Sequence, residues 1–330
     1  MATRFEILLH GENASALRAA GEEALDEIDR LEARLSLFQA SSEIAHLNAR
    51  AARGPVRITP GLFALLQRAK ELHEETGGAF DITIAPLVRC WGFMGGSGQK
   101  PEAVALAEAR AKVGMALVEL DRNDFTVCFK AEGVMLDLGA IGKGYAIERA
   151  VELLRDAGVT SALLHGGTST VYGLGRPPEG ECWRVAIEDP KARTGSHQVT
   201  ISASEKEQAG QGSGSAKILA TVPLKDEAMS VSAIWGKFFE AEGKTFGHIL
   251  DPRTGQPADG AVLSAVVLPS ATDTDALSTA LLIRGVEGHE EIAKLRPGMK
   301  TLLVIEFEGR LRLQSKGIDV EPVLLSTRDA

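Results

Sequence analysis

The stretch that decides the fold reads FGHILDPRTGQP at residues 246–257, AVLSAVVL at 261–268 and SATDTDALSTALL at 270–282. In the first segment, alternating residues predict a strand, and the Asp, Pro, Thr and Gly residues that follow predict a turn. The apolar second segment predicts another strand, and the third predicts a helix. On that helix Asp275 and Thr279 are four residues apart, so their oxygen atoms face the same way.

His248 ends the alternating part of the first segment. Its neutral imidazole is suited to accept a hydroxyl proton, although a single strand histidine is more often structural. Asp275 and Thr279 offer the oxygen donors that Mg²⁺ prefers. The alternative is that Thr272 or Asp273 caps the helix and that Asp275 only benefits from its place in the first turn. A base and two oxygen donors beside turns together favour metal-assisted chemistry on a phosphate.

A second informative segment covers residues 134–159 and predicts a strand, a glycine-spaced turn and a helix. Its turn, DLGAIGKGYA, lets the backbone approach a ligand at Gly139, and the helix after it offers free N–H groups to an anion. Lys143 adds a positive charge suited to a phosphate. Because neither GxxxxGK[ST] nor GxGxxG is present, a plain tight turn remains the alternative to a phosphate cradle.

The rest of the chain carries many strand patterns and fewer helical ones. Residues 162–174 predict one strand broken by Gly166-Gly167, a pair that suits either close approach of a ligand or a β-bulge. The polar segment 194–217 predicts a mobile loop. This mixture favours the α+β class, and we expect a single unit over residues 1–330 with mixed or antiparallel sheets and flanking helices in two interleaved lobes. Further helices are predicted over 14–37, 61–76, 101–112 and 287–294, with a short one beginning at Ser42 and Glu43.

The bulk composition is that of an ordinary globular protein. Of 330 residues, 44% are hydrophobic and 25% charged, which excludes global disorder. The net charge of -9 argues against a general nucleic-acid binder. Cys90, Cys128 and Cys182 show neither metal spacing nor a disulfide framework. No apolar run approaches the ~20 residues of a membrane span, and the N-terminus lacks a secretory pattern. We therefore expect a cytoplasmic protein, or an extracytoplasmic one if a leader was removed.

Several motifs, taken together and in order, resemble the ApbE family of FAD:protein FMN transferases. The resemblance covers nearly the whole chain. It is most specific in LDLGAIGKGYA, GHILDPRTG and DALSTAL, whose joint occurrence by chance is very improbable. The other matching segments are SLFQASSEIAHLN (36–48), GAFDITIAPLVRCWGF (78–93), LLHGGTST (163–170) and WRVAIEDP (183–190).

The resemblance implies a reaction and a site. A Thr or Ser hydroxyl of a target protein, expected to be a redox or respiratory subunit, would attack the FMN-side phosphorus of FAD, and AMP would leave. Asp275, Thr279 and the main-chain oxygen of Ala140 would hold Mg²⁺, and His248 would be the catalytic base. The residues implied in holding FAD are Glu43, Asp81, Gly139, Lys143, Gly166, Gly167 and Thr168.

The chain departs from the family pattern at three places. Thr168 stands where Asp or Asn usually follows the glycine pair, and Phe246 stands where Tyr is common. Ser232-Ala233 replaces a frequent Ser-Gly. Two alternatives use the same site: an Mg²⁺-dependent FAD pyrophosphatase, in which water replaces the protein hydroxyl, and a flavin-binding protein without turnover. An intact set of Asp275, Thr279 and His248 argues against the second.

Overall fold

The computed structural model describes residues 3–189, 218–234, 236, 238–241 and 243–320, without the side chain of Lys244. The segment 194–217, predicted as a mobile loop, therefore lies outside the described residues. No helix in the described ranges is both long enough and apolar enough to cross a membrane.

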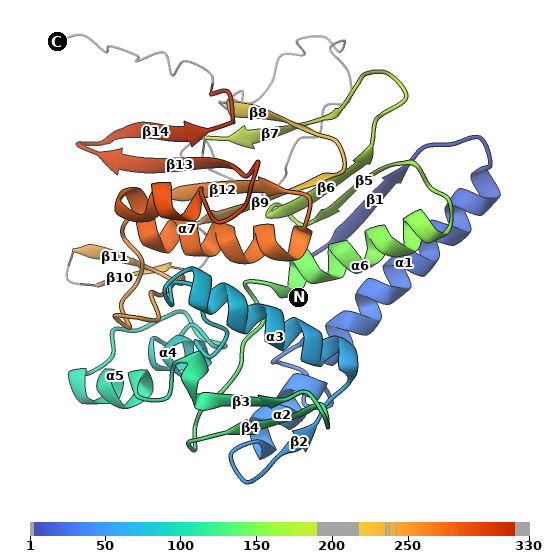
Figure 1. The fold of residues 1–330 in the computed structure, drawn as a ribbon. Coiled ribbons are helices and arrows are strands. Elements are labelled where there is room, and N and C mark those ends of the chain that lie inside the picture. The colour runs from blue at the N-terminus through green and yellow to red at the C-terminus, as the bar shows by residue number, and fades with distance from the viewer. Residues whose placement is uncertain (1–2, 190–217, 235, 237, 242, 321–330) are drawn as a thin grey trace, which may run out of the picture.

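The central element is a seven-stranded sheet in which every neighbouring pair is antiparallel (Figure 1). In spatial order its strands are β1 (Phe5–Leu9), β5 (Ser161–Gly166), β6 (Thr170–Gly175), β9 (Glu227–Ala233), β12 (Leu263–Leu268), β13 (Lys300–Phe307) and β14 (Arg310–Lys316). The predicted strands at 261–268, 301–306 and 310–313 are confirmed. Residues 162–174 form two paired strands, β5 and β6, instead of one interrupted strand, because the turn after the glycine pair reverses the chain.

Both faces of this sheet are covered. Helices α1 (Ala14–Leu35), α6 (Gly142–Asp156) and α7 (Ala271–Ile292) pack on one face, and the pair β7 (Trp183–Glu188) and β8 (Ile218–Leu224) packs on the other (Figure 1). Strand β12 shows the result: Val266 and Leu268 join the helical core, while Ala265 and Val267 join the core under β7 and β8. A strand buried on both faces favours apolar residues, which explains the run in β12. The exception is the buried Ser264, whose hydroxyl donates to the Ser278 carbonyl at 2.7 Å.

The remaining elements form a second region below α7 in Figure 1. A small apolar cluster there gathers Leu87, Trp91, Phe93, Ala109 and Leu250. Phe246, which replaces the common Tyr, packs beside this cluster, 5.6 Å from the Trp91 ring. The elements are α2 (Glu43–Arg50), α3 (Pro60–Glu75), α4 (Ala85–Cys90), α5 (Ala103–Arg110), the 3₁₀ turn η1 (Met115–Leu117), the sheet of β2 (Val56–Arg57), β4 (Thr126–Phe129) and β3 (Val118–Asp121), and the pair β10 (Phe238–Ala241) and β11 (Lys244–Gly247).

The strand predicted at the start of segment 134–159 is wrong. Residues 134–138 pair with no strand in the described structure. Their backbone groups are satisfied in another way: the Asn48 amide donates to the Leu136 carbonyl and accepts from its N–H, at 2.9 and 2.8 Å. The N–H of Asp137 donates to the Ile82 carbonyl. A side chain and a loop thus replace the neighbouring strand, and they lead the chain directly into α6.

Candidate active site

A cleft of about 930 Å³ lies where α6, α7, β9 and the second region meet. Its volume is at the upper end of the range usual for ligand sites. Most of the residues proposed from the sequence line it, although they come from segments up to 198 positions apart (Asp81 to Thr279). They are Asp81, Gly139, Ala140, Lys143, Thr168, His248, Asp275 and Thr279.

The first turns of α6 and α7 meet at Asp275. The buried Asp275 carboxylate accepts a hydrogen bond of 3.0 Å from the N–H of Gly144, and its other oxygen lies 3.5 Å from the Lys143 ammonium. Lys143 also donates to the Gly139 carbonyl at 3.1 Å. The glycine turn therefore places a cation and a carboxylate side by side on the cleft wall. The ammonium is suited to a phosphate, whereas the N–H groups of Gly142 and Gly144 at the start of α6 already donate to the Leu138 carbonyl and to Asp275.

Thr279 lies one helical turn further along α7, on the same side as Asp275. Its hydroxyl is 3.2 Å from the Ser232 hydroxyl of β9, which is also 2.9 Å from the Ser278 hydroxyl. These contacts attach α7 to the sheet directly behind the cleft and limit the rotamers of Thr279.

The donors in this part of the cleft suit Mg²⁺. Asp275 supplies a carboxylate and Thr279 a hydroxyl, and Ala140 also lines the cleft. Within the described ranges no three His, Cys, Asp or Glu side chains gather as a metal cluster. Mg²⁺ does not require one, since it commonly binds through one or two carboxylates and takes its other ligands from waters and substrate phosphates.

Asp81 places a second carboxylate on the cleft wall. Its buried carboxylate accepts from the Thr83 N–H and hydroxyl at 2.7 and 2.6 Å, and its other oxygen lies 3.1 Å from Nδ1 of His73. Burial lowers the pKa of His73, but hydrogen bonding and charge from Asp81, together with the Phe80 carbonyl, outweigh it. The pKa of His73 therefore lies above its ordinary 6.5.

This histidine predicts a pH-dependent stability. A group with a raised folded-state pKa stabilises the protein fully below its unfolded pKa, about 6.5, and loses this contribution as the pH rises through the folded pKa. The free energy of unfolding of the wild type should therefore exceed that of the His73→Gln variant. This difference should be larger at pH 6 than at pH 8. Urea unfolding of both proteins at the two pH values measures the difference. An equal difference at both values would contradict the role of His73.

His248 directly follows β11 and also lines the cleft. Its imidazole packs edge-on against the Phe93 ring, with centroids 6.5 Å apart. The backbone at Gly236 passes so close that a Cβ there would lie 3.1 Å from Cε1 of His248. The chain thus brings the base candidate and the oxygen donors of α7 to one cavity.

Comparison with known proteins shows the family of the chain. The ApbE family model matches residues 1–303 of the chain. The chain belongs to the ApbE family. The FAD:protein FMN transferase of Treponema pallidum is 31% identical over 324 residues, covering 94% of this chain and 83% of the relative.

Two solved ApbE structures share the fold. The flavinyl transferase ApbE of Pseudomonas stutzeri, in its apo form, is 26% identical with a TM-score of 0.76, covering 96% of this chain and 95% of that one. The ApbE protein of Thermotoga maritima is 26% identical with a TM-score of 0.77, covering 94% and 92%. The α+β class with antiparallel sheets, expected from the sequence, is confirmed.

Three residues that the ApbE resemblance assigned to FAD lie apart from the described cleft lining. The Glu43 carboxylate accepts from Arg34 at 3.0 Å and from the Thr59 N–H at 2.6 Å, so it joins α1, α2 and the start of α3. Gly166 and Gly167 close the β5–β6 turn against the N-terminal strand, and a Cβ on Gly166 would lie 2.7 Å from the Phe5 ring. All three make contacts within the fold, while Thr168 and Ser169, next along the turn, reach the cleft.

Asp137 is a cleft residue that the sequence analysis did not single out. Its carboxylate accepts from the Gly139 N–H at 2.8 Å, and burial raises its pKa against the opposing effects of that N–H and of Lys143. The residue stands in the ApbE motif LDLGAIGKGYA, so the motif contained the signal. The sequence did not show that this aspartate lies within a segment that forms no strand and lines the cavity.

Gly144 is predicted to be intolerant of any side chain. A Cβ there would overlap the Ala271 carbonyl oxygen and lie 2.8 Å from Cβ of Asp275. Gly144→Ala should lower the free energy of unfolding by ~1–3 kcal/mol, as overpacking does, and should reduce activity because α6 and α7 separate at Asp275. Gly142→Ala, two residues earlier with 3.9 Å to its nearest neighbour, is the matched control. Equal stability of the two variants in thermal unfolding would contradict the close-packing argument.

Proposed function

We propose that this protein transfers FMN from FAD to a Thr or Ser hydroxyl of a target protein in a Mg²⁺-dependent reaction that releases AMP. The observation that carries the proposal is the meeting of Asp275, Thr279 and His248 in one cleft beside Lys143. Membership of the ApbE family and the transferase names of the relatives support it.

The residues divide into those that hold FAD and those that act on the hydroxyl. Lys143 at the start of α6 would bind the diphosphate. Asp81 and Thr168 would contact other parts of FAD from the cleft wall. Asp275, Thr279 and the Ala140 carbonyl would hold Mg²⁺, which when bound would offset charge on the diphosphate oxygens.

The chemical step is a displacement at phosphorus. The acceptor hydroxyl oxygen forms a bond to the FMN-side phosphorus, the bond from that phosphorus to the bridging oxygen breaks, and the bridging oxygen leaves as part of AMP. His248 takes the hydroxyl proton and later returns it to solvent. Such proton removal typically contributes ~10²–10⁴-fold to the rate.

Intact mass spectrometry tests the proposal. A candidate acceptor peptide carrying the family's Thr motif is incubated with the protein, FAD and Mg²⁺, and its mass is followed together with AMP release. A mass gain of one FMN that depends on Mg²⁺ would support the transferase. Free FMN and AMP without peptide modification would indicate a pyrophosphatase, and no consumption of FAD would indicate a flavin-binding protein.

A further inference from the structure

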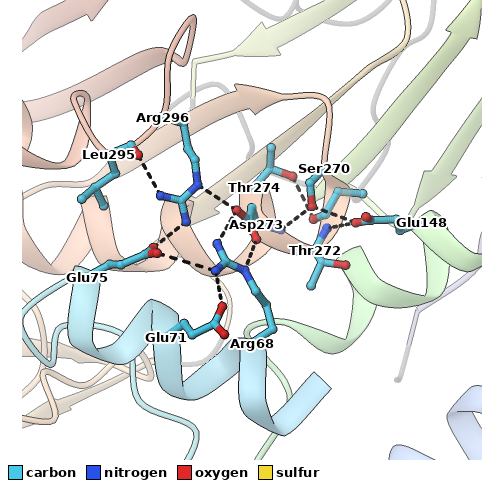
Figure 2. A network of polar contacts seen from close by, with 11 residues as sticks. Arg68, Glu71, Glu75, Glu148, Ser270, Thr272, Asp273, Thr274, Leu295 and Arg296 are labelled. Atoms are coloured by element: carbon cyan, nitrogen blue, oxygen red, sulfur yellow. Dashed lines mark hydrogen bonds and ion pairs between the residues drawn. The ribbon is translucent and has the colours of Figure 1, made fainter. Parts of the chain in front are cut away.

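The first turn of α7 carries Asp273, which lies in a network of charged side chains (Figure 2). Asp273 accepts two hydrogen bonds from the guanidinium of Arg68 on α3, at 2.9 and 2.7 Å. It accepts a third, at 3.1 Å, from Nε of Arg296 in the segment after α7. Because residues two apart in a helix point about 200° from each other, Asp273 faces α3 while Asp275 faces α6 and the cleft.

Both arginines are themselves held in place. Arg68 donates to Glu71 at 2.7 Å, and Arg296 donates to Glu75 at 2.5 Å, with both acids on α3. A guanidinium is planar and donates in fixed directions, so two of them on one carboxylate restrict its orientation strongly. The side chain of Asp273 is only 10% exposed, so water competes little for these bonds.

A third contact holds the same turn from α6. The Glu148 carboxylate accepts from the Ser270 hydroxyl at 2.9 Å and from the Thr272 N–H at 2.7 Å. Ser270 is the N-cap residue of α7, and its hydroxyl oxygen accepts from the Asp273 N–H. The start of α7 is therefore fixed from two neighbouring helices on the two sides seen in Figure 2.

The function of the Asp273 cluster is not explained by stability alone. Replacing a buried ion pair with apolar residues of similar size is often neutral or stabilising, so charges are a costly way to join two helices. What they provide is a defined geometry. Rotation of α7 about its axis would move the Asp275 carboxylate and the Thr279 hydroxyl together relative to the Ala140 backbone.

We propose that Asp273, held by Arg68 and Arg296, is a positioning residue that sets the rotation of α7 and so presents Asp275 and Thr279 to Mg²⁺. The inference rests on the proposed metal role of those two residues. Loosening the cluster should weaken metal binding, while turnover at saturating Mg²⁺ should fall much less.

Mn²⁺ binding to the full-length protein, followed by electron paramagnetic resonance without FAD or acceptor, tests this directly. Asp273→Asn and Arg68→Met should each raise the Mn²⁺ dissociation constant by ~10–100-fold, the usual effect of losing a group that orients a metal ligand. Glu227→Gln is the matched control. It breaks a partly buried ion pair of 2.8 Å between Glu227 and Lys300, two residues of the sheet that do not line the cleft. Its Mn²⁺ affinity should stay that of the wild type.

A double variant, Arg68→Met with Asp273→Leu, separates geometry from stability, since apolar replacement should keep the helices packed. Weak Mn²⁺ binding with a wild-type Tm would support the positioning role. Wild-type affinity in this variant, or an equal loss in Glu227→Gln, would overturn it. If the wild-type protein itself bound no Mn²⁺, both the metal assignment and this inference would fail. If the wild type and all variants bound Mn²⁺ normally, only the positioning role would fail.

Discussion

Replacing Asp275 with Ala should lower turnover more than ~100-fold, since even indirect partners of a metal ligand cost 10–100-fold. The variant loses the only carboxylate among the three proposed Mg²⁺ ligands. It also leaves the Gly144 N–H and Lys143 without the partner they have in the structure. The rate of FMN transfer as a function of Mg²⁺ concentration measures the effect, and added Mg²⁺ should not restore it.

Two further variants make this result specific. Asp275→Asn keeps an oxygen that can accept from Gly144 but removes the charge, so it should fold like the wild type and still be nearly inactive. Asp259→Ala removes an exposed aspartate outside the described cleft lining and should leave activity unchanged. Wild-type activity in either Asp275 variant would remove this residue from the metal site.

His248→Ala should slow transfer by ~10²–10⁴-fold, the usual contribution of a positioned base. FAD affinity should change little, because Lys143, the cation proposed to bind the diphosphate, is on α6 and not beside His248. Single-turnover kinetics gives the rate of the chemical step, and flavin fluorescence titration gives the FAD affinity separately.

The control for this histidine is His46→Ala, which removes an exposed imidazole on α2. A His248→Ala protein that bound FAD poorly but transferred FMN at the normal rate once saturated would show that His248 binds the substrate and is not the base. The pH dependence of the residual rate should also lose the limb that reports deprotonation of an imidazole.

Local sequence patterns predicted most elements near the site correctly. The alternation before His248 became β11, the apolar run became β12, and the helix carrying Asp275 became α7. The capping alternative was wrong in detail, because Ser270 caps α7 and Asp273 binds two arginines instead. The contacts of Ser270 and Asp273 are made with α6 and α3, which are far from α7 in the sequence.

The separate helix predicted over 287–294 has a counterpart in the structure. Within α7, which reaches Ile292, Gly285 has non-helical backbone angles with φ 57°. Only glycine adopts such a conformation readily, so α7 consists of two helical parts that meet at Gly285. The periodicity on each side of this residue predicted both parts.

The sequence by itself determined the fold class, the family and the chemical types of the site residues, because periodicity and short motifs are local properties of the chain. Tertiary structure alone decided which of those residues meet. Gly144 contacts Asp275 across 131 positions, and Arg68 contacts Asp273 across 205. It also left Glu43 and the glycine pair outside the described cleft lining and placed Asp137 in it. Such contacts depend on how α3, α6 and α7 pack against one another, and this packing is set by side-chain shape over the whole core, not by any one segment.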